Sequence, residues 1–203
     1  MTALSVFLIG GYAAANAESD NNIVTGKAPD FTLTDINGNE VSLSQFAGKV
    51  VVLEWTNYDC PFVQAHYDHD PQTMTELAIK YAGQDVVWLT INSTYYATPQ
   101  AIKEWASNHG IEKQTVLIDT DGKVGKLYHA RTTPDMFIID KDGNIVYQGA
   151  IDNAPLGKNN GPYINYVDQA LTQLLAGEQI TIPQTKSYGC SVKYPPENKT
   201  PDK

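Results

Sequence analysis

Two cysteines are the side chains of this 203-residue sequence best suited to covalent chemistry. Cys60 follows a nearly continuous apolar and β-branched run at 49–56, and Pro61 opens a helical stretch to about Tyr67. A helix N-terminus favours negative charge, and proline is common in a first helical turn. A thiol at this position ionises more easily, and the thiolate is the nucleophile. The pattern favours a reactive Cys60 over a buried, inert one.

The second cysteine lies far along the chain. Cys190 is part of the segment 187–191, in an irregular and Pro-rich stretch that follows Gly177, and we expect it outside the core. Three roles are open for Cys190. It resolves an oxidised Cys60 by forming a disulfide with it, it forms a permanent structural disulfide with Cys60, or it stays unpaired or pairs with another molecule. A bridge would close a loop of about 130 residues and stabilise the fold by roughly 4–5 kcal/mol in the chain-entropy model. A structural bridge and a catalytic one look alike in the sequence.

Aromatic side chains accompany Cys60, namely Trp55, Tyr58 and Phe62. They either shape an apolar vestibule for a substrate or pack in the core, and core packing explains Trp55 equally well. We include Trp55 and Pro61 among the residues expected to bind substrate.

Potential metal ligands follow the predicted helix. His66, Asp68, His69 and Asp70 come soon after Cys60. Thiolate, imidazole and carboxylate groups bind copper or zinc. A polar surface loop accounts for the same residues, so we predict no metal and no cofactor.

Strands and helices must alternate to position these residues. The strongest strand patterns are at 49–56, 86–91 and 115–118, with hairpins expected over 31–43 and 136–148. Helices are expected at about 61–67, 72–82, 98–108, 123–128 and 162–175. The alternation implies parallel strands, and the later hairpin adds an antiparallel edge. The sequence therefore predicts an α/β fold, a central mixed β-sheet flanked by helices on both faces.

Several motifs resemble one family. The segments 26–33 and 38–43, followed by the buried strand, look like the opening of the alkyl hydroperoxide reductase/thiol-specific antioxidant (peroxiredoxin-like) and redoxin families. Thr133-Pro134 before 136–140 resembles the cis-proline loop of the thioredoxin fold, and the likeness covers about 24–178. The segments 54–63, 88–93, 131–134 and 188–194 look like an uncharacterised bacterial branch of peroxiredoxin-like proteins.

The resemblance implies a thioredoxin-like fold and thiol-based redox chemistry. It also implies that Pro134 is cis, with its loop packed against Cys60. Such a loop offers a backbone edge to a partner peptide or a small thiol, so we assign Thr133 and Pro134 to substrate binding.

The chain departs from the family patterns at three places. Val63 stands where thioredoxins carry the second cysteine of Cys-x-x-Cys, and Asn57 stands where peroxiredoxins carry a threonine. Thr56 lies one residue earlier, and Arg131 precedes the position expected for the peroxiredoxin arginine. Peroxide cleavage needs donors that orient the O–O bond. Thr56 and Arg131 are therefore the candidate catalytic residues beside Cys60 and Cys190.

The resemblance places peroxide reduction first: Cys60 reduces a peroxide, and Cys190 or an external thiol resolves the oxidised form. Thiol–disulfide exchange is the alternative. A binding module without turnover and a metal-delivery protein are further alternatives. The expected partners are a peroxide or disulfide substrate and a thiol reductant of the thioredoxin type.

Charge and the ends of the chain bound the remaining possibilities. The formal charge is −9 and Arg131 is the single arginine, which disfavours nucleic acid as a partner. Residues 4–15 form a mostly apolar run and 15–17 a small-x-small cleavage site, so that 1–17 are typical of a signal peptide. We expect a linker at 18–25, a redoxin domain at 26–178 and a tail at 179–203. The sequence predicts export, to the bacterial periplasm, without stable membrane insertion after cleavage.

Overall fold

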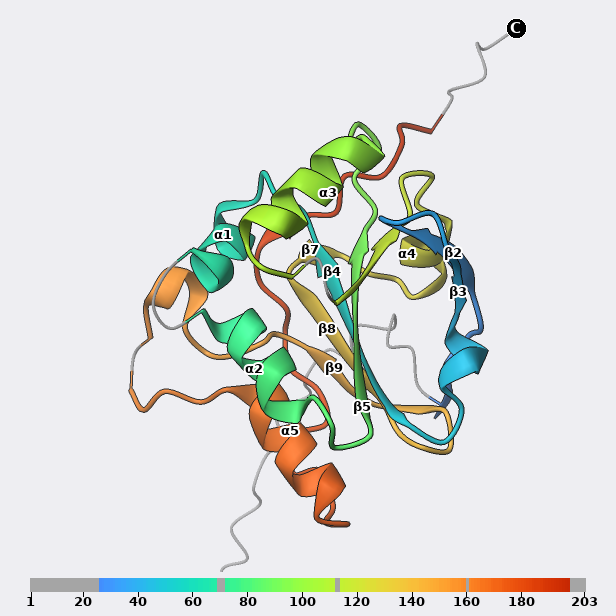
Figure 1. The fold of residues 1–203 in the computed structure, drawn as a ribbon. Coiled ribbons are helices and arrows are strands. Elements are labelled where there is room, and N and C mark those ends of the chain that lie inside the picture. The colour runs from blue at the N-terminus through green and yellow to red at the C-terminus, as the bar shows by residue number, and fades with distance from the viewer. Residues whose placement is uncertain (1–25, 69–71, 112–113, 160, 198–203) are drawn as a thin grey trace, which may run out of the picture.

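The computed structural model describes residues 26–68, 72–111, 114–159 and 161–197 (Figure 1). The predicted signal peptide at 1–17, the linker at 18–25 and the residues His69 and Asp70 lie outside these ranges. Within them, no helix has the length and apolar character needed to cross a membrane.

The strands have the following bounds: β1 Gly26–Lys27, β2 Thr32–Asp35, β3 Glu40–Ser42, β4 Val50–Thr56, β5 Val86–Asn92, β6 Thr115–Ile118, β7 Thr132–Thr133, β8 Asp135–Ile139, β9 Asn144–Gly149 and β10 Cys190–Ser191. The helices are α1 Pro61–Tyr67, α2 Thr73–Tyr81, α3 Pro99–Asn108, α4 Lys123–Leu127 and α5 Tyr166–Leu175. Two 3₁₀ turns cover Leu43–Phe46 and Pro155–Gly157. Most bounds agree with the sequence patterns to within two residues.

The main sheet has the strand order β1-β9-β8-β4-β5-β6-β2-β3. β4, β5 and β6 are parallel, as predicted, and the other pairs are antiparallel. The prediction that the late hairpin forms an edge is wrong, because β8 lies beside β4 inside the sheet and β1 covers β9. This position matters for the site, since the register pairs Trp55 with Asp135 and brings the 132–134 loop to the end of β4.

Two apolar layers pack on the two faces of the sheet. One layer contains buried residues of α1, α2, α3 and α5, together with Val52, Ile138 and Cys60. The other contains Leu53, Phe137 and residues of α4 and the first 3₁₀ turn. Alternate residues of β4 and β8 point to opposite layers, which is the period-2 pattern of a strand buried on both faces. Helices therefore cover both faces, but very unequally.

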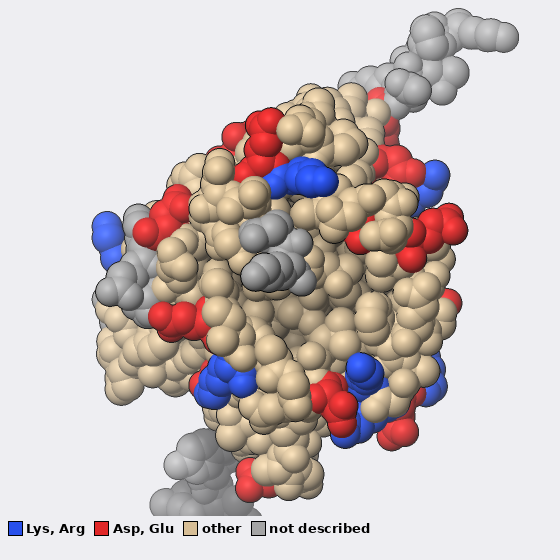
Figure 2. All heavy atoms as spheres, in the orientation of Figure 1, with Lys and Arg blue, Asp and Glu red and all other residues tan. Residues whose placement is uncertain are grey.

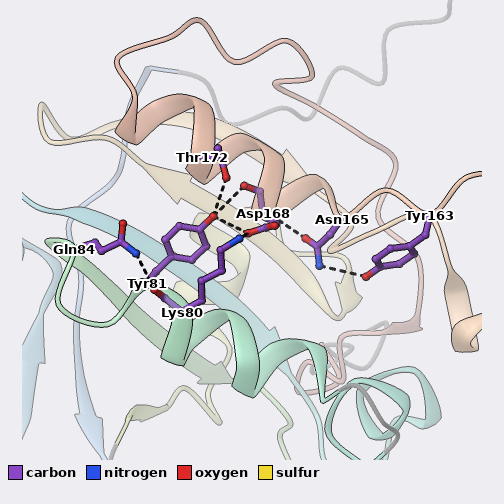
Figure 3. A network of polar contacts seen from close by, with 7 residues as sticks. All are labelled: Lys80, Tyr81, Gln84, Tyr163, Asn165, Asp168 and Thr172. Atoms are coloured by element: carbon purple, nitrogen blue, oxygen red, sulfur yellow. Dashed lines mark hydrogen bonds and ion pairs between the residues drawn. The ribbon is translucent and has the colours of Figure 1, made fainter.

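A polar network joins α2 to α5 on the heavily covered face (Figure 3). The Tyr81 hydroxyl donates to Asp168 and shares a hydrogen bond with Thr172, while Lys80 forms an ion pair with the same carboxylate. Charged side chains are interspersed over this face, with wide uncharged areas between them (Figure 2).

Helix α5 begins four residues later than the pattern suggested, at Tyr166 rather than at Pro162. The Asn165 side chain accepts a hydrogen bond from the Asp168 amide and caps the helix there. The preceding residues instead continue as extended chain, since the Asn153 amide donates to the Ile164 carbonyl. An N-cap asparagine fits this boundary better than a proline farther upstream.

The segment after α5, residues 178–197, returns across the end of the sheet, and we call it the strap. Its two-residue strand β10 pairs antiparallel with β7 in a second small sheet (Figure 1). Earlier in the strap, the Thr185 amide donates to the Gln148 carbonyl, beside Gly149. A Cβ at Gly149 would lie 2.4 Å from the Thr185 carbonyl oxygen, so only glycine permits this approach. The strap residues are thus built into the domain.

Candidate active site

The local sequence places Cys60 at the head of α1. Cys60 is the N-cap with extended backbone, Pro61 occupies the first helical position, and the Gln64 amide donates to the Cys60 carbonyl at 2.9 Å. The Cys60 amide donates to the Asn57 carbonyl, which closes the turn after β4. The predicted strand–Cys–Pro–helix arrangement is therefore confirmed.

The proline loop lies against this cysteine. The Thr133–Pro134 peptide bond is cis. The Cys60 thiol donates to the Thr133 carbonyl oxygen over 3.0 Å. Both predictions for this loop, the cis bond and its packing against Cys60, are confirmed.

Cys190 reaches the same place from the strap. In the pairing of β10 with β7, Cys190 lies opposite Thr133. Its thiol and its backbone amide both donate hydrogen bonds to the Cys60 sulfur, and both cysteines are free thiols in the structure. Cys190 is half-buried and lies outside the core layer itself, as expected, but it packs directly against the layer that contains Cys60.

The environment gives the two thiols different acidities. Burial disfavours the Cys60 thiolate, but hydrogen bonds from Cys190 and from the Val63 amide outweigh it and lower the pKa of Cys60. Burial raises the pKa of Cys190, and so do the hydrogen bond to Cys60 and the charge there. The first thiolate to form is therefore that of Cys60, while Cys190 remains a protonated donor beside it.

Cys60 is only 1% exposed. It belongs to the buried layer on the face of α1, and the strap residues Tyr188 and Cys190 pack against that layer. The sulfur therefore lies where the core layer meets the strap, and Cys190 contacts it directly.

Trp55 does not line a vestibule at Cys60, because the two residues belong to different apolar layers. It is fully buried in the opposite apolar layer, its ring packs on Tyr128 and Phe137, and its Nε1 donates to Ser93. The core-packing alternative describes Trp55 better. Phe62, by contrast, is half-buried and packs against the strap.

Thr56 and Arg131, the two remaining candidate catalytic residues, differ in their burial. Thr56 is buried at the end of β4, and its hydroxyl has no hydrogen-bond partner. Arg131 has an exposed side chain, its amide donates to Asp135, and its carbonyl accepts from the Val192 amide. Their assignment to catalysis remains a prediction.

Two buried carboxyl groups near the strand ends were not selected from the sequence. Glu54 accepts hydrogen bonds from Tyr67 and Trp88, yet burial raises its pKa to about 7. Asp135, directly after Pro134, accepts from the Arg131 amide, and burial also raises its pKa to about 7. The signal for Glu54 was its place as a lone acid within an apolar strand.

A polar anchor holds the strap beside α1. The Tyr188 hydroxyl donates to the buried carboxylate of Asp152 and is hydrogen-bonded to His66 at 2.9 Å. Asp68, in contrast, pairs with His109. Among the described residues there is no group of three or more side chains suited to holding a metal ion.

The chain is similar to several known proteins. A sequence model described as the AhpC/TSA family matches residues 24–148. The thiol-disulfide oxidoreductase ResA of Bacillus thuringiensis subsp. konkukian (strain 97-27) is 30% identical over 122 residues, which are 60% of this chain and 66% of that protein. The match thus spans slightly less than two thirds of the relative.

Solved structures show the same architecture. An uncharacterized conserved protein from Geobacillus kaustophilus is 30% identical, with a TM-score of 0.77 over 91% of this chain and 99% of that one. A candidate thiol:disulfide interchange protein DsbE from Chlorobium tepidum is 24% identical, with a TM-score of 0.55 over 76% of this chain and 97% of that one. The predicted thioredoxin-like fold is confirmed.

Proposed function

The chain belongs to the AhpC/TSA family, and on that premise we propose that it is a thiol–disulfide oxidoreductase whose two reacting cysteines are Cys60 and Cys190. The observation that carries the proposal is the contact between these thiols beside the cis-proline loop. The similarity to ResA proteins, which are named thiol-disulfide oxidoreductases, supports the reaction type.

The proposed reaction has two exchange steps. The Cys60 thiolate attacks one sulfur of a partner disulfide, that S–S bond breaks, and the other partner sulfur leaves as a thiolate. Cys190 then loses its proton and attacks the Cys60 sulfur, which releases the second partner thiol and leaves a Cys60–Cys190 disulfide. The partner is reduced by two electrons and the protein is oxidised by two. An external thiol reductant of the thioredoxin type restores both thiols.

Cys190 supplies the second thiol that thioredoxins carry inside the Cys-x-x-Cys motif. Val63 occupies the usual position and contributes only its backbone amide to Cys60. The approach of Cys190 from the strap supports this substitution. The lowered pKa of Cys60 and the raised pKa of Cys190 support the assignment of attacking and resolving roles.

Trapping experiments test the roles. With hydroxyethyl disulfide as substrate, we expect the wild type to lose two hydrogen atoms in its intact mass. Cys190→Ser stops at a mixed disulfide on Cys60, and Cys60→Ser forms neither product. A Cys60→Ser protein that still turns over the substrate would contradict the proposal.

Peroxide reduction, which the family resemblance places first, becomes the second candidate. Besides that resemblance, the buried Thr56 hydroxyl without a hydrogen-bond partner favours it. In Cys190→Ser, dimedone labelling of Cys60 after treatment with hydrogen peroxide measures sulfenate formation. If peroxide oxidises Cys60 faster than the disulfide does, peroxide reduction is the main activity.

We also propose that the protein is exported, on the apolar run and cleavage site at 1–17. An oxidising compartment suits a cysteine pair that cycles through a disulfide. Fractionation of expressing cells, with the mature N-terminus determined by mass spectrometry, tests this: cleavage after Ala17 is the expected result.

A further inference from the structure

The strap occupies the backbone edge at which the cis-proline loop would receive a partner. Cys190 and Ser191 pair with Thr133 and Thr132, and the Val192 amide continues the ladder to the Arg131 carbonyl. Farther along, the Tyr194 hydroxyl donates to the Ala130 carbonyl. The whole edge 130–133 is therefore taken by residues of the same chain.

This occupancy also places a sulfur where a partner's sulfur must arrive. Cys190 contacts the Cys60 sulfur directly, and Cys60 has almost no exposed surface. Thiol–disulfide exchange requires the attacking sulfur to reach the partner disulfide. An external disulfide therefore reaches Cys60 only after the strap has left the edge, and it then takes the position of Cys190.

The backbone edge at Thr133 restricts which residue type can stand directly before the reacting cysteine. Gly189 has φ +137°, and a Cβ there would lie 2.2 Å from the Thr133 carbonyl oxygen and 2.7 Å from the carbonyl carbon. Both atoms belong to the backbone of the cis-proline loop, which cannot rotate away as a flexible side chain would. A segment bound in this register fits only with glycine before its cysteine.

Polar and aromatic side chains contact the residue before that glycine. Tyr188 packs its ring against Phe62, and its hydroxyl reaches Asp152 and His66 at the side of α1. The strap thus presents an aromatic residue, glycine and cysteine in succession to matching features of the site.

We propose that the strap is a tethered mimic of the substrate, and that the edge of β7 receives extended peptides whose reacting cysteine follows a glycine. The inference rests on the proposed function and deepens it by naming the substrate class. The strap and the partner compete for one edge, so Cys60 is protected until a partner peptide displaces residues 188–194. The chemical step is the first exchange described above, in which the partner disulfide breaks and its distal sulfur leaves as a thiolate.

A pair of peptides tests the glycine requirement. The probes are an acetylated peptide with the sequence of 187–194 and its variant with alanine for glycine, each with its cysteine activated as a mixed disulfide with 5-thio-2-nitrobenzoate. Full-length Cys190→Ser attacks the activated sulfur with Cys60 and releases the coloured thiolate. We expect the glycine peptide to form the Cys60 adduct at least about fivefold faster, because overpacking against rigid backbone is costly.

A second variant tests whether the strap shields Cys60 from external disulfides. On the Cys190→Ser background, Gly189→Ala introduces the clash into the strap itself. Ser191→Ala, in contrast, keeps the backbone pairing and removes an exposed hydroxyl whose hydrogen bond comes from Lys193 of the same strap. We expect Gly189→Ala to speed the reaction of Cys60 with hydroxyethyl disulfide, and Ser191→Ala to leave it unchanged. Both peptides are measured in Cys190→Ser and in its combinations with Gly189→Ala and Ser191→Ala. If the strap excludes both peptides from one of these proteins, the preference for glycine can still be measured in another.

The outcomes separate the two proposals. Equal rates for the glycine and alanine peptides in the Gly189→Ala background, where the edge is open, overturn the substrate class. Cys60 reactivity that Gly189→Ala leaves unchanged overturns the shielding of Cys60 by the strap. If Cys60 reacts with neither peptide nor with hydroxyethyl disulfide in any background, the oxidoreductase function itself fails.

Discussion

At the residue scale, the two thiols set each other's acidity. The Cys190 thiol and amide donate to the Cys60 sulfur and favour its thiolate, and the thiolate in turn makes Cys190 harder to ionise. The same contact therefore acts in opposite directions on the two groups.

This reciprocity gives the first prediction. In Cys190→Ala the pKa of Cys60 rises, because a donor to its thiolate is lost while burial remains. In Cys60→Ala the pKa of Cys190 falls, because the neighbouring charge is lost. Each variant keeps a single thiol, so the ultraviolet absorbance of the thiolate during a pH titration reports one group. A Cys60 pKa that is unchanged in Cys190→Ala would show that the strap does not assist ionisation.

The buried acid in β4 gives the second prediction. The pKa of Glu54 is raised from 4.5 to about 7 by burial, so its carboxyl binds a proton more tightly in the folded chain than in the unfolded one. Its contribution to stability is fully present below about pH 4.5 and is lost as the pH rises through 7, by roughly 3 kcal/mol. Glu54→Gln removes this loss.

Urea denaturation at a series of pH values measures the effect. The difference in unfolding free energy between wild type and Glu54→Gln should shift in favour of the variant between pH 5 and pH 8. Comparison of the two proteins cancels the parallel contribution of Asp135, whose pKa is also about 7. A difference that stays constant over this interval would mean that Glu54 is ionised throughout.

At the scale of elements, the network between α2 and α5 gives the third prediction. The Tyr81 ring is buried, and its hydroxyl is bonded to Asp168 and Thr172. Tyr81→Phe keeps the ring and removes these bonds, which should cost about 1 kcal/mol in unfolding free energy. Tyr95→Phe is the control, because Tyr95 is 50% exposed and its change should cost nothing measurable.

The elements also show which parts of the fold depend only on residues that are close together in the sequence. The turn after β4, the Cys60-Pro61 helix start and the hairpin at 136–148 depend on residues close together in the chain, and the patterns predict them well. The start of α5 was missed, because the pairing of 152–153 with 164–165 competes with the helix for the same residues.

The path of the strap could not be predicted in the same way. It depends on close backbone approaches between distant residues, Gly149 to Thr185 and Gly189 to Thr133. A glycine in a Pro-rich tail signals freedom of the backbone, not the partner that uses it. The sequence therefore leaves the meeting of Cys60 and Cys190 as one of several alternatives, whereas the structure brings both cysteines to Thr133 of β7.

At the scale of the whole molecule, oxidation should change stability, which is the fourth prediction. A Cys60–Cys190 disulfide closes a loop of about 130 residues in the unfolded chain and stabilises the fold by roughly 4–5 kcal/mol in the chain-entropy model. The urea midpoint of the oxidised wild type should lie above that of the reduced protein. In Cys190→Ser the two midpoints should coincide, and a wild type without any difference would show that the cross-link strains the fold.

The strap has one more consequence, for the newborn polypeptide. The strap residues leave the ribosome long after the sheet and α1. An almost complete chain therefore carries the Cys60 sulfur without the strap over it. Folding intermediates and products clipped after Gly177 should therefore form mixed disulfides readily with stray disulfides, whose second sulfur leaves as a thiolate, whereas the completed molecule shelters the Cys60 sulfur once 188–194 have settled into place.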